Sequence, residues 1–379
     1  MRLERRLRQP RWLMVVVPVC SLVVAFVLAG VVLLVTGHDP ISAYHQLFDA
    51  AFISPGSLDE TLITATPLAF TGLAAAAAFR MRLFNVGGEG QLYLGAIGAS
   101  AAGLYFGGLR WPQTLVVVAM VVAGLAGGAV WALIPGILRA FFKTNEIITS
   151  LMLNYVAANL LTYLIFNTES YWRQTKGFNA AVFPTSKTIP ARAFWPGLTI
   201  HLQGGIVVPL GAGIAVLVAF VLWALYTRTR FGFEAQVLGD SPRAARYAGI
   251  RTRRKILAVM AISGGIAGLA GASQVGDFAH MLDADPDGLQ KQFYGYTGIV
   301  VAALARYNPF AVLLCAFLIG GLQNAGNTLQ GADFPSGLVG VIQGIILFTA
   351  LGGEVLVRNR IRFGRRPSEA PIAPAEVPV

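Results

Sequence analysis

Long apolar runs recur along the whole chain and are separated by short polar segments. The hydrocarbon core of a bilayer is about 30 Å thick and requires about twenty apolar residues per helix, because unpaired backbone polar groups are too costly in lipid. Ten runs reach or approach that length, at residues 13–36, 61–79, 91–108, 113–138, 146–166, 205–226, 256–275, 293–305, 309–326 and 336–356. The pattern therefore predicts an all-α fold, a polytopic transmembrane helical bundle of about ten segments.

Composition and charge define the class of protein and its orientation. Only 12% of the residues are charged and 55% are hydrophobic, whereas soluble domains carry about 25% charged residues. If the N-terminus is cytoplasmic, all but six of the 29 Lys and Arg residues fall on the inner side. The positive-inside rule then predicts that both termini are cytoplasmic and that the number of spans is even. The net charge of +11 follows from this topology, so we expect contact with membrane lipid and no nucleic-acid partner.

The spacing of the apolar runs predicts one membrane domain. We expect cytoplasmic tails at 1–12 and 358–379 and a transmembrane domain at 13–357, with a cytoplasmic loop at 228–255. The first run follows basic residues, as in a signal peptide, but it is too long for a signal h-region and predicts an uncleaved span. The run at 293–305 is too short for an upright span, which predicts a broken or re-entrant helix.

Two further patterns concern helix packing. Pairs of glycines four positions apart, which allow helices to approach closely, occur at Gly124 and Gly128, at Gly264 and Gly268, and at Gly340 and Gly344. Residues 71–80 (TGLAAAAAFR) and 297–306 (TGIVVAALAR) agree at five of ten positions. This agreement indicates a possible parallel internal repeat. Chance agreement in Ala-rich sequence remains the alternative.

The sequence contains no motif for catalysis, nucleotide binding or a metal cluster. We therefore expect no catalytic centre, no metal site and no cofactor on this chain. Glu89 and Glu146 lie where predicted helices begin, so stabilisation by the helix dipole is the simpler interpretation and transport chemistry the alternative. Residues 283–288 resemble the start of an EF-hand, but Tyr294 stands where the bidentate Glu belongs, so an acidic outer loop is the better interpretation.

The inner loop at 228–255 indicates a partner protein. Its apolar residues among the charges are Phe231, Phe233, Val237, Leu238, Tyr247 and Ile250. The pattern predicts one or two short amphipathic helices that are broken near Gly239 and Pro242. Such helices dock into a groove of a soluble subunit or lie on the membrane surface, held by anionic lipid. Both alternatives stay open at this point.

One segment resembles the signature of a known family. Residues 84–96 (FNVGGEGQLYLGA) are similar to the FN-I/V-G-x-EGQ-x-x-x-GA signature of ABC transporter permeases of the branched-chain amino acid and simple-sugar class, most closely the nucleoside-type members. Three further segments resemble the same family, at 66–73, 144–155 and 239–250. Together these matches extend over most of the chain.

The resemblance implies the permease subunit of an importer in a bacterial plasma (inner) membrane. Separate ABC ATP-binding subunits would hold ATP and Mg, and an extracytoplasmic substrate-binding lipoprotein would deliver the substrate. Members commonly form heterodimers, which implies a second permease subunit. The inner loop would couple to the ATPase through Glu234, Leu238, Gly239, Ala245, Arg246, Tyr247, Gly249 and Ile250. Asp240 stands where the family often has Asn, and the EAA pattern is one residue short.

The expected substrate is a neutral nucleoside, because amides and aromatic groups can bind base and ribose without charge. Candidates for the substrate path are Asn85, Glu89, Gln91, Asn154, Tyr155, Asn159, Gln323, Asn324 and Asn327. Hydrogen bonding between helices explains the same amides, and a simple sugar remains a second substrate class. An ion-coupled secondary transporter is the rival class of protein, but such carriers usually place ionisable groups in mid-membrane.

Overall fold

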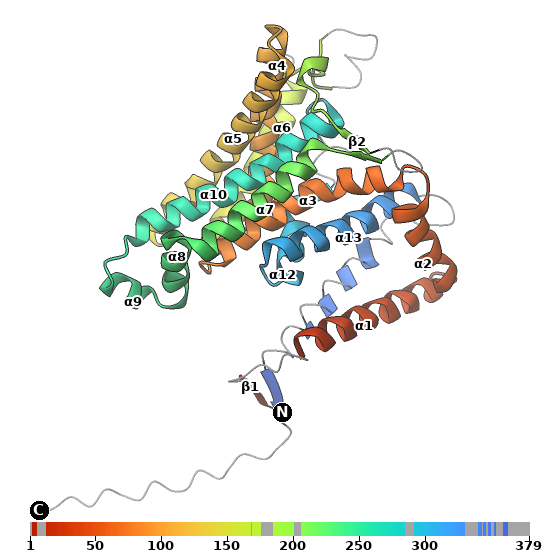
Figure 1. Ribbon diagram of the computed structural model, residues 1–379, viewed down its shortest axis with the longest axis vertical. Helices are drawn as coiled ribbons and strands as arrows, with labels where there is room; N and C mark the ends of the chain where they lie inside the picture. The colour runs from red at the N-terminus through yellow and green to blue at the C-terminus, as the bar shows by residue number, and fades with distance from the viewer. Residues whose placement is uncertain are drawn as a thin grey trace, which may run out of the picture. The chain divides into compact units, whose positions relative to one another are not determined.

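The computed structural model describes residues 2–5, 13–167, 169–175, 185–200, 206–284, 292–329 and 359–362, with short stretches between 340 and 353. The chain divides into two compact units, residues 1–40 with 340–379 and residues 41–339, and each is described by itself. Most of the described residues are helical (Figure 1). In chain order the elements are β1 (Arg2–Arg5), α1 (Leu13–Val35), α2 (Pro40–Phe48), η1 (Asp49–Ile53), α3 (Ser57–Phe79), α4 (Gly88–Gly108), α5 (Gln113–Phe142), α6 (Glu146–Phe166), η2 (Ala191–Ala193), β2 (Leu198–Ile200), β3 (Ile206–Val208), α7 (Leu210–Arg228), α8 (Arg230–Asp240), α9 (Pro242–Tyr247), α10 (Thr252–Ser273), η3 (Gln274–Ala279), α12 (Tyr294–Leu304), α13 (Pro309–Thr328) and β4 (Asn359–Arg362).

The predicted apolar runs fall on helices in the described part of the chain, except that the run at 205–226 begins with the strand β3 and its helix, α7, starts only at Leu210. Among the described residues, six helices are long and apolar enough to cross a membrane, and the number rises to seven if Val23–Val35 and Pro40–Ile53 are taken as one span. The short run near residue 300 is α12, which has 11 residues. Most of the predicted last run, 336–356, lies outside the described residues. The total of ten segments therefore stays a prediction.

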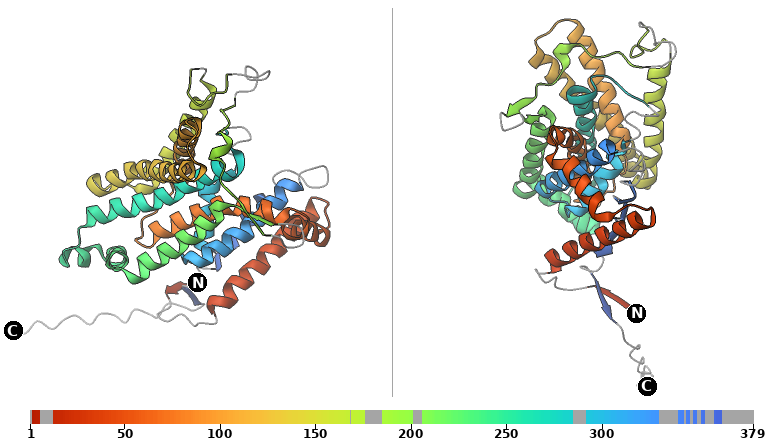
Figure 2. Two further views of the ribbon diagram at one scale, coloured as in Figure 1. Left: turned by 45° about the horizontal axis from the view of Figure 1, so that its top comes forward. Right: turned by 90° about the vertical axis from the view of Figure 1, so that its right-hand side faces the viewer.

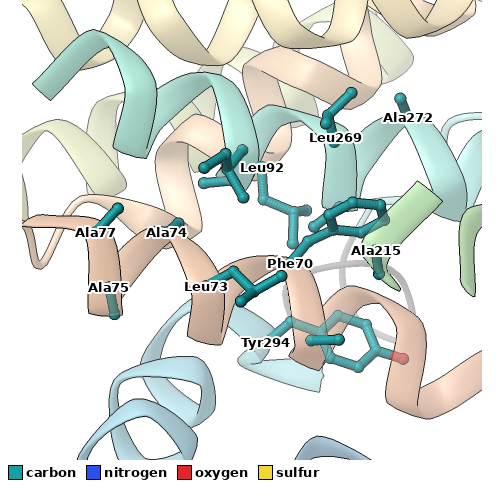
Figure 3. Packing of buried hydrophobic residues seen from close by; sticks show 14 of the residues in the cluster. Phe70, Leu73, Ala74, Ala75, Ala77, Leu92, Ala215, Leu269, Ala272 and Tyr294 are labelled. Carbon is teal, nitrogen blue, oxygen red and sulfur yellow. The ribbon is translucent and has the colours of Figure 1, made fainter. Parts of the chain in front are cut away.

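The larger unit is built around α3. This helix is apolar on all sides, and such a helix is stable only when neighbours cover it. It packs against α7, α10, α12 and α13, and nearly all of its residues between 64 and 78 are buried. Figure 3 shows side chains of α3, including Phe70 and Leu73, among Leu92 of α4, Leu269 of α10 and Tyr294 of α12. The small side chains of the alanine run after Leu73 allow the neighbouring helices to pack close to this central helix.

Glycines bring α4, α5 and α10 into backbone contact. A Cβ atom added to Gly128 of α5 would lie within 3.0 Å of the backbone of Gly264 and Gly268 in α10. An added Cβ on Gly95 of α4 would likewise collide with the backbone of Gly268. The close approach predicted at the first two glycine pairs is confirmed, whereas a Cβ on Gly340 or Gly344 meets no described atom within 4 Å. Figure 2 shows the resulting layers, with α5, α10, α3 and α13 in that order.

The inner loop contains two short helices, as predicted. α8 ends at Asp240, α9 begins at Pro242, and the break falls at Ser241. Ser241 Oγ caps α9 by accepting from the backbone N–H of Ala244 at 3.3 Å. Pro242 has no backbone N–H, but the N–H at the first position of a helix has no acceptor within the helix, so the proline costs no hydrogen bond there. α8 follows α7, which ends at Arg228, and α9 follows α8.

Segments far apart in sequence are joined at two other places. The backbone N–H of Ile189 donates to the carbonyl of His280 at 2.8 Å, and that of Trp195 donates to Gly276 at 3.0 Å. These bonds attach the segment before β2 to the end of η3. In the smaller unit, β1 pairs antiparallel with β4, so that Arg2 lies opposite Arg362. This pairing brings residues near the two ends of the chain together.

Candidate functional site

Asn85 and Gln91 of the signature segment form a reciprocal pair of side-chain amides. Asn85 Nδ2 donates to Gln91 Oε1 at 2.8 Å, and Gln91 Nε2 donates to Asn85 Oδ1 at 2.9 Å. Asn85 Nδ2 also donates to Ser263 Oγ of α10 at 2.9 Å, and that hydroxyl donates to the carbonyl of Ala74 in α3 at 2.7 Å. The amide pair therefore ties the loop before α4 to α3, α4 and α10.

Asn154 attaches α6 to the same region. Its Oδ1 accepts from the backbone N–H of Gly90 at 2.9 Å, and its Nδ2 donates to the carbonyl of Val86 at 2.9 Å and to the Tyr296 hydroxyl at 3.1 Å. A Cβ atom on Gly90 would lie 3.1 Å from the Asn154 Cα, so glycine permits this approach. Both polar atoms of the Asn154 side chain are thus engaged within the chain, as buried amides require.

Glu89 is a buried carboxylate between the first turns of two helices. It is the second residue of α4, and its Oε2 accepts from the backbone N–H of Gly295, the second residue of α12, at 2.6 Å. Its Oε1 accepts from the Tyr93 hydroxyl at 2.7 Å. The first N–H groups of a helix have no partner within the helix, and the helix dipole favours an anion beside them. Glu89 therefore caps α12 while lying in the first turn of α4.

Two other carboxylates in or beside membrane helices have comparable roles. Asp277 of η3 accepts from the backbone N–H of Gly211, the second residue of α7, through Oδ2 at 3.0 Å. Glu146 is the first residue of α6, as expected, and its Oε2 lies 3.2 Å from Nε of Arg139 at the end of α5. Each of these acidic groups has a structural partner in a neighbouring helix.

We call Asn85, Glu89, Gln91, Asn154 and Ser263 the polar cluster. Its hydrogen bonds join α3, α4, α6, α10 and α12 (Figure 1). Four of these five residues were predicted as path candidates, and the structure brings those four together. The geometry fits a structural junction, because their hydrogen-bonding atoms already have partners in the chain. Ser263 was missed, since a single serine in an apolar run carries no signal of its own.

The other path candidates lie apart from the polar cluster. Tyr155 is 61% exposed, and Asn159 donates through Nδ2 to the carbonyl of Tyr155 at 2.8 Å. In α13, the buried Asn324 donates through Nδ2 to the Ser57 carbonyl at 3.2 Å, which joins α13 to the start of α3. The remaining two, Gln323 and Asn327, also lie on α13, where Asn327 is exposed.

The exposed face of α6 differs from that of α5. The α6 face carries Met152, Tyr155, Val156, Asn159 and Tyr163, spaced as one stripe of a helix. After its first turn, the exposed large side chains of α5, such as Val118, Val122 and Val130, are apolar. An apolar face suits lipid, whereas an amide and two phenols suit a polar path or a partner helix. We call this set of five α6 residues the α6 stripe.

The eight predicted ATPase-coupling residues divide into a buried and an exposed set. Leu238 and Ala245 are buried, and a Cβ on Gly239 would lie 3.0 Å from the backbone of Met81 in the loop after α3. The predicted role of Leu238 as an anchor in a partner groove is therefore replaced by one in attaching α8 to the chain itself. Tyr247 is 94% exposed and is available to a partner. The remaining four are half-buried or exposed, namely Glu234, Arg246, Gly249 and Ile250.

Two ion pairs hold the inner loop against the membrane helices. Lys255 Nζ lies 2.6 Å from Glu234 Oε2, which joins the start of α10 to α8. Arg82 NH2 lies 2.8 Å from Asp240 Oδ1, which joins the end of α8 to the loop after α3. Asp240, which departs from the Asn common in the family, thus has an ionic partner. The Arg82–Asp240 pair is exposed and contributes about 0–1 kcal/mol, so it mainly sets orientation, whereas Lys255 and Glu234 are half-buried.

Comparison with known proteins identifies the family. A family model described as branched-chain amino acid transport system / permease component matches residues 57–351. The chain belongs to this family. It is a permease component of an ABC transporter, and the match includes the polar cluster, the α6 stripe and the inner loop. The class of ion-coupled carriers is thereby set aside.

This permease is similar over most of its length to proteins named for two substrate classes. It is 33% identical to a glucose ABC transporter permease of Haloferax volcanii, over 98% of this chain and 96% of that protein. It is 31% identical to a nucleoside ABC transporter permease of Lactococcus lactis, over 88% of this chain and 90% of that protein. It is 32% identical to a guanosine ABC transporter permease of Bacillus subtilis, over 87% and 91% of the two chains.

Proposed function

We propose that this permease imports nucleosides across a bacterial plasma membrane, together with a second permease subunit. The observation that carries the proposal is the family match over residues 57–351, together with the nucleoside and guanosine permeases among its relatives. An extracytoplasmic substrate-binding lipoprotein delivers the substrate, and separate ATP-binding subunits holding ATP and Mg supply the energy.

The substrate path in this proposal runs along the α6 stripe. Tyr155, Asn159 and Tyr163 offer hydrogen bonds and aromatic faces on a helix side that the rest of the described chain leaves uncovered. A neutral substrate requires no charged partner, and these three side chains are neutral. Ribose hydroxyls can bond to the amide, and a base can stack on a phenol ring. The polar cluster then supports the path by fixing α6 to α4 and α12.

The proposed coupling surface lies on α8 and α9. Tyr247 is the exposed anchor for a groove of the ATPase, and Gly239, which packs against the backbone of Met81 just after α3, transmits the motion to the membrane helices. The alternative of a membrane-surface helix places more weight on the basic residues 251–255 than on Tyr247.

The proposed topology has ten segments with both termini in the cytoplasm and tails at 1–12 and 358–379. The β1–β4 pairing supports an even number of spans, because it requires both strands to lie on one side of the membrane. The possible internal repeat stays a prediction; an added Cβ on Gly298 would collide with Thr71. The two matching Thr-Gly segments therefore lie against each other.

Uptake by the complete complex tests the substrate. The permease pair, its ATPase and its binding lipoprotein are reconstituted in vesicles, and uptake of labelled guanosine is measured with unlabelled glucose or nucleosides as competitors. Competition by nucleosides and none by glucose supports the proposal. The reverse result assigns a simple sugar, the second candidate, which the similarity to the glucose permease favours.

A variant pair tests the path. Asn159→Ala removes a hydrogen bond worth about 0.5–1.5 kcal/mol, so uptake at low substrate concentration should fall by roughly twofold to tenfold. Val156→Ala is the matched control, because Val156 lies on the same exposed stripe and has no polar group. Equal uptake by the two variants would exclude Asn159 from the path.

A further inference from the structure

α12 begins at mid-depth in the bundle. The hydroxyl of Thr71 in α3 donates to the carbonyl of Tyr294, the first residue of α12, at 2.9 Å. Thr71 lies 14 residues after the start of α3 at Ser57 and eight before its end at Phe79, which places it about 21 Å and about 12 Å from the two ends. α3 is one of the helices long and apolar enough to cross a membrane. A backbone break at this depth is tolerated only where protein covers it or where it faces a water-filled path.

Phe293, the residue before α12, is strained and exposed. Its φ angle of 49° lies in the left-handed region, which a bulky residue rarely adopts. Its side chain is 57% exposed, whereas that of the next residue, Tyr294, is 5% exposed. Strained residues of this kind cluster at active sites and ligand clamps. The start of α12 thus presents an aromatic ring that the described part of the chain leaves largely uncovered.

Tyr296 connects this ring to α6. Its ring centroid lies 6.2 Å from that of Phe293, with the two planes at 47°. Its hydroxyl accepts from Asn154 Nδ2 at 3.1 Å and lies within electrostatic reach of the Tyr155 hydroxyl. Asn154 belongs to the polar cluster and Tyr155 to the α6 stripe. We call Phe293 and Tyr296 the aromatic pair, which therefore lies beside the proposed substrate path, with one ring held in place by a hydrogen bond.

We propose that the aromatic pair binds the planar base of a nucleoside during transport and so favours nucleosides over sugars. The base stacks on the exposed face of Phe293 and meets the edge of Tyr296, which Asn154 orients. Every base has a flat π-face for such stacking, whereas a sugar ring is not planar. A face that met only lipid would need no hydroxyl, and the exposed large side chains of α5 after its first turn have none. The inference deepens the proposed function and rests on it.

Photolabelling of the complete complex tests the aromatic pair. The complex in lipid nanodiscs is irradiated with 8-azidoadenosine, and the labelled peptides are identified by mass spectrometry. We expect labelling within residues 293–304 and in α6 that unlabelled guanosine displaces and glucose does not. Phe293→Leu removes the aromatic face and should weaken this labelling at least fivefold, because base stacking strengthens binding roughly fivefold to 150-fold.

Two variants serve as controls. Phe293→Tyr keeps an aromatic ring and should restore the labelling. Phe310→Leu removes an exposed ring from the first turn of α13 and should leave the labelling unchanged. Thermal unfolding in detergent should give equal midpoints for all three variants, which separates the loss of a ring from the loss of the fold.

The outcomes distinguish this inference from the proposed function. Native-level labelling of Phe293→Leu in a complex that imports guanosine overturns the inference but not the proposed function. Import of glucose and not of guanosine by the native complex overturns both. Weaker co-purification of the second permease with Phe293→Leu would assign the ring to the contact between subunits, and native labelling confined to other residues would assign the base to another site. Either of these two results also overturns the inference.

Discussion

Glu89 shows how one buried side chain holds a short helix in place. Its carboxylate accepts hydrogen bonds from Tyr93 and from the first turn of α12. α12 has only 11 residues, and isolated helices of that length are marginal in water. The position of α12 against α4 therefore depends on this contact as well as on apolar packing.

Replacement of Glu89 separates a capping role from a path role. Glu89→Ala leaves buried donors without acceptors, which costs about 1–3 kcal/mol for each. We expect a lower thermal unfolding temperature in detergent and faster hydrogen exchange in α12. Glu89→Gln, which keeps an acceptor oxygen, should lose less. Glu60→Ala is the control, since Glu60 also lies in the first turn of a long helix but is exposed. Normal stability of Glu89→Ala with loss of uptake would assign Glu89 to the path.

Tyr247 and Leu238 give opposite expectations for the same substitution. Tyr247→Asp should leave expression and thermal stability unchanged, because the side chain is 94% exposed. It should weaken co-purification of the ATPase by roughly thirtyfold, as loss of a central anchor costs about 2 kcal/mol. Leu238→Asp should lower the stability of the permease itself, because it places a charge in a buried position. If Tyr247→Asp binds the ATPase normally while neutral replacements at 251–255 disturb the protein, the membrane-surface alternative holds.

At the scale of elements, the junction of α4, α5 and α10 depends on glycine. Without a hydrophobic driving force in lipid, helices associate through close packing, and small residues make it possible. Gly268 lies at the centre of this junction, facing Gly124, Gly128 and Gly95. The junction has no space for an additional methyl group at Gly268.

Gly268→Ala should therefore destabilise the permease although alanine favours helices. The added methyl group collides with the backbone of Gly124, and overpacking of this kind costs about 1–3 kcal/mol. Gly213→Ala in α7 is the control, because a Cβ there meets no described atom within 4 Å. Thermal unfolding in detergent should show a lower midpoint for the first variant and an equal or higher midpoint for the second. Equal midpoints would mean that the helices shift without cost.

At the scale of the whole molecule, accessibility across the membrane tests the proposed topology. Cysteines replace Ser241 and Thr175, which are both exposed, in a background without Cys20 and Cys315. Ser241 caps α9, and Thr175 follows α6 in the predicted outer loop. A membrane-impermeant thiol reagent added to intact cells should label Thr175→Cys and spare Ser241→Cys until the cells are opened. Labelling of both positions from outside would contradict the topology.

The sequence by itself determined the class of protein, the family and the order of the helices. Apolar runs fix membrane helices because the backbone must satisfy its hydrogen bonds internally in lipid, so the helices at 113–142 and 309–328 begin where the sequence predicts. The break between α8 and α9 was likewise visible, since Pro242 starts a helix and cannot continue one. These features depend on residues that are close together in the sequence.

Only the tertiary structure decided which partners the polar residues have. In the sequence, the path candidates include Asn85, Glu89, Gln91 and Asn154. A polar side chain in a membrane helix gives the same sequence pattern whether it faces a substrate or another helix. Their partners Ser263 and Gly295 lie more than a hundred residues away along the chain. Leu238 and Tyr247 show the same limit, because both are apolar residues of the inner loop and only the structure shows that Leu238 is buried and Tyr247 is exposed. Burial and hydrogen-bond partners are properties of the packed bundle, and the local pattern does not contain them.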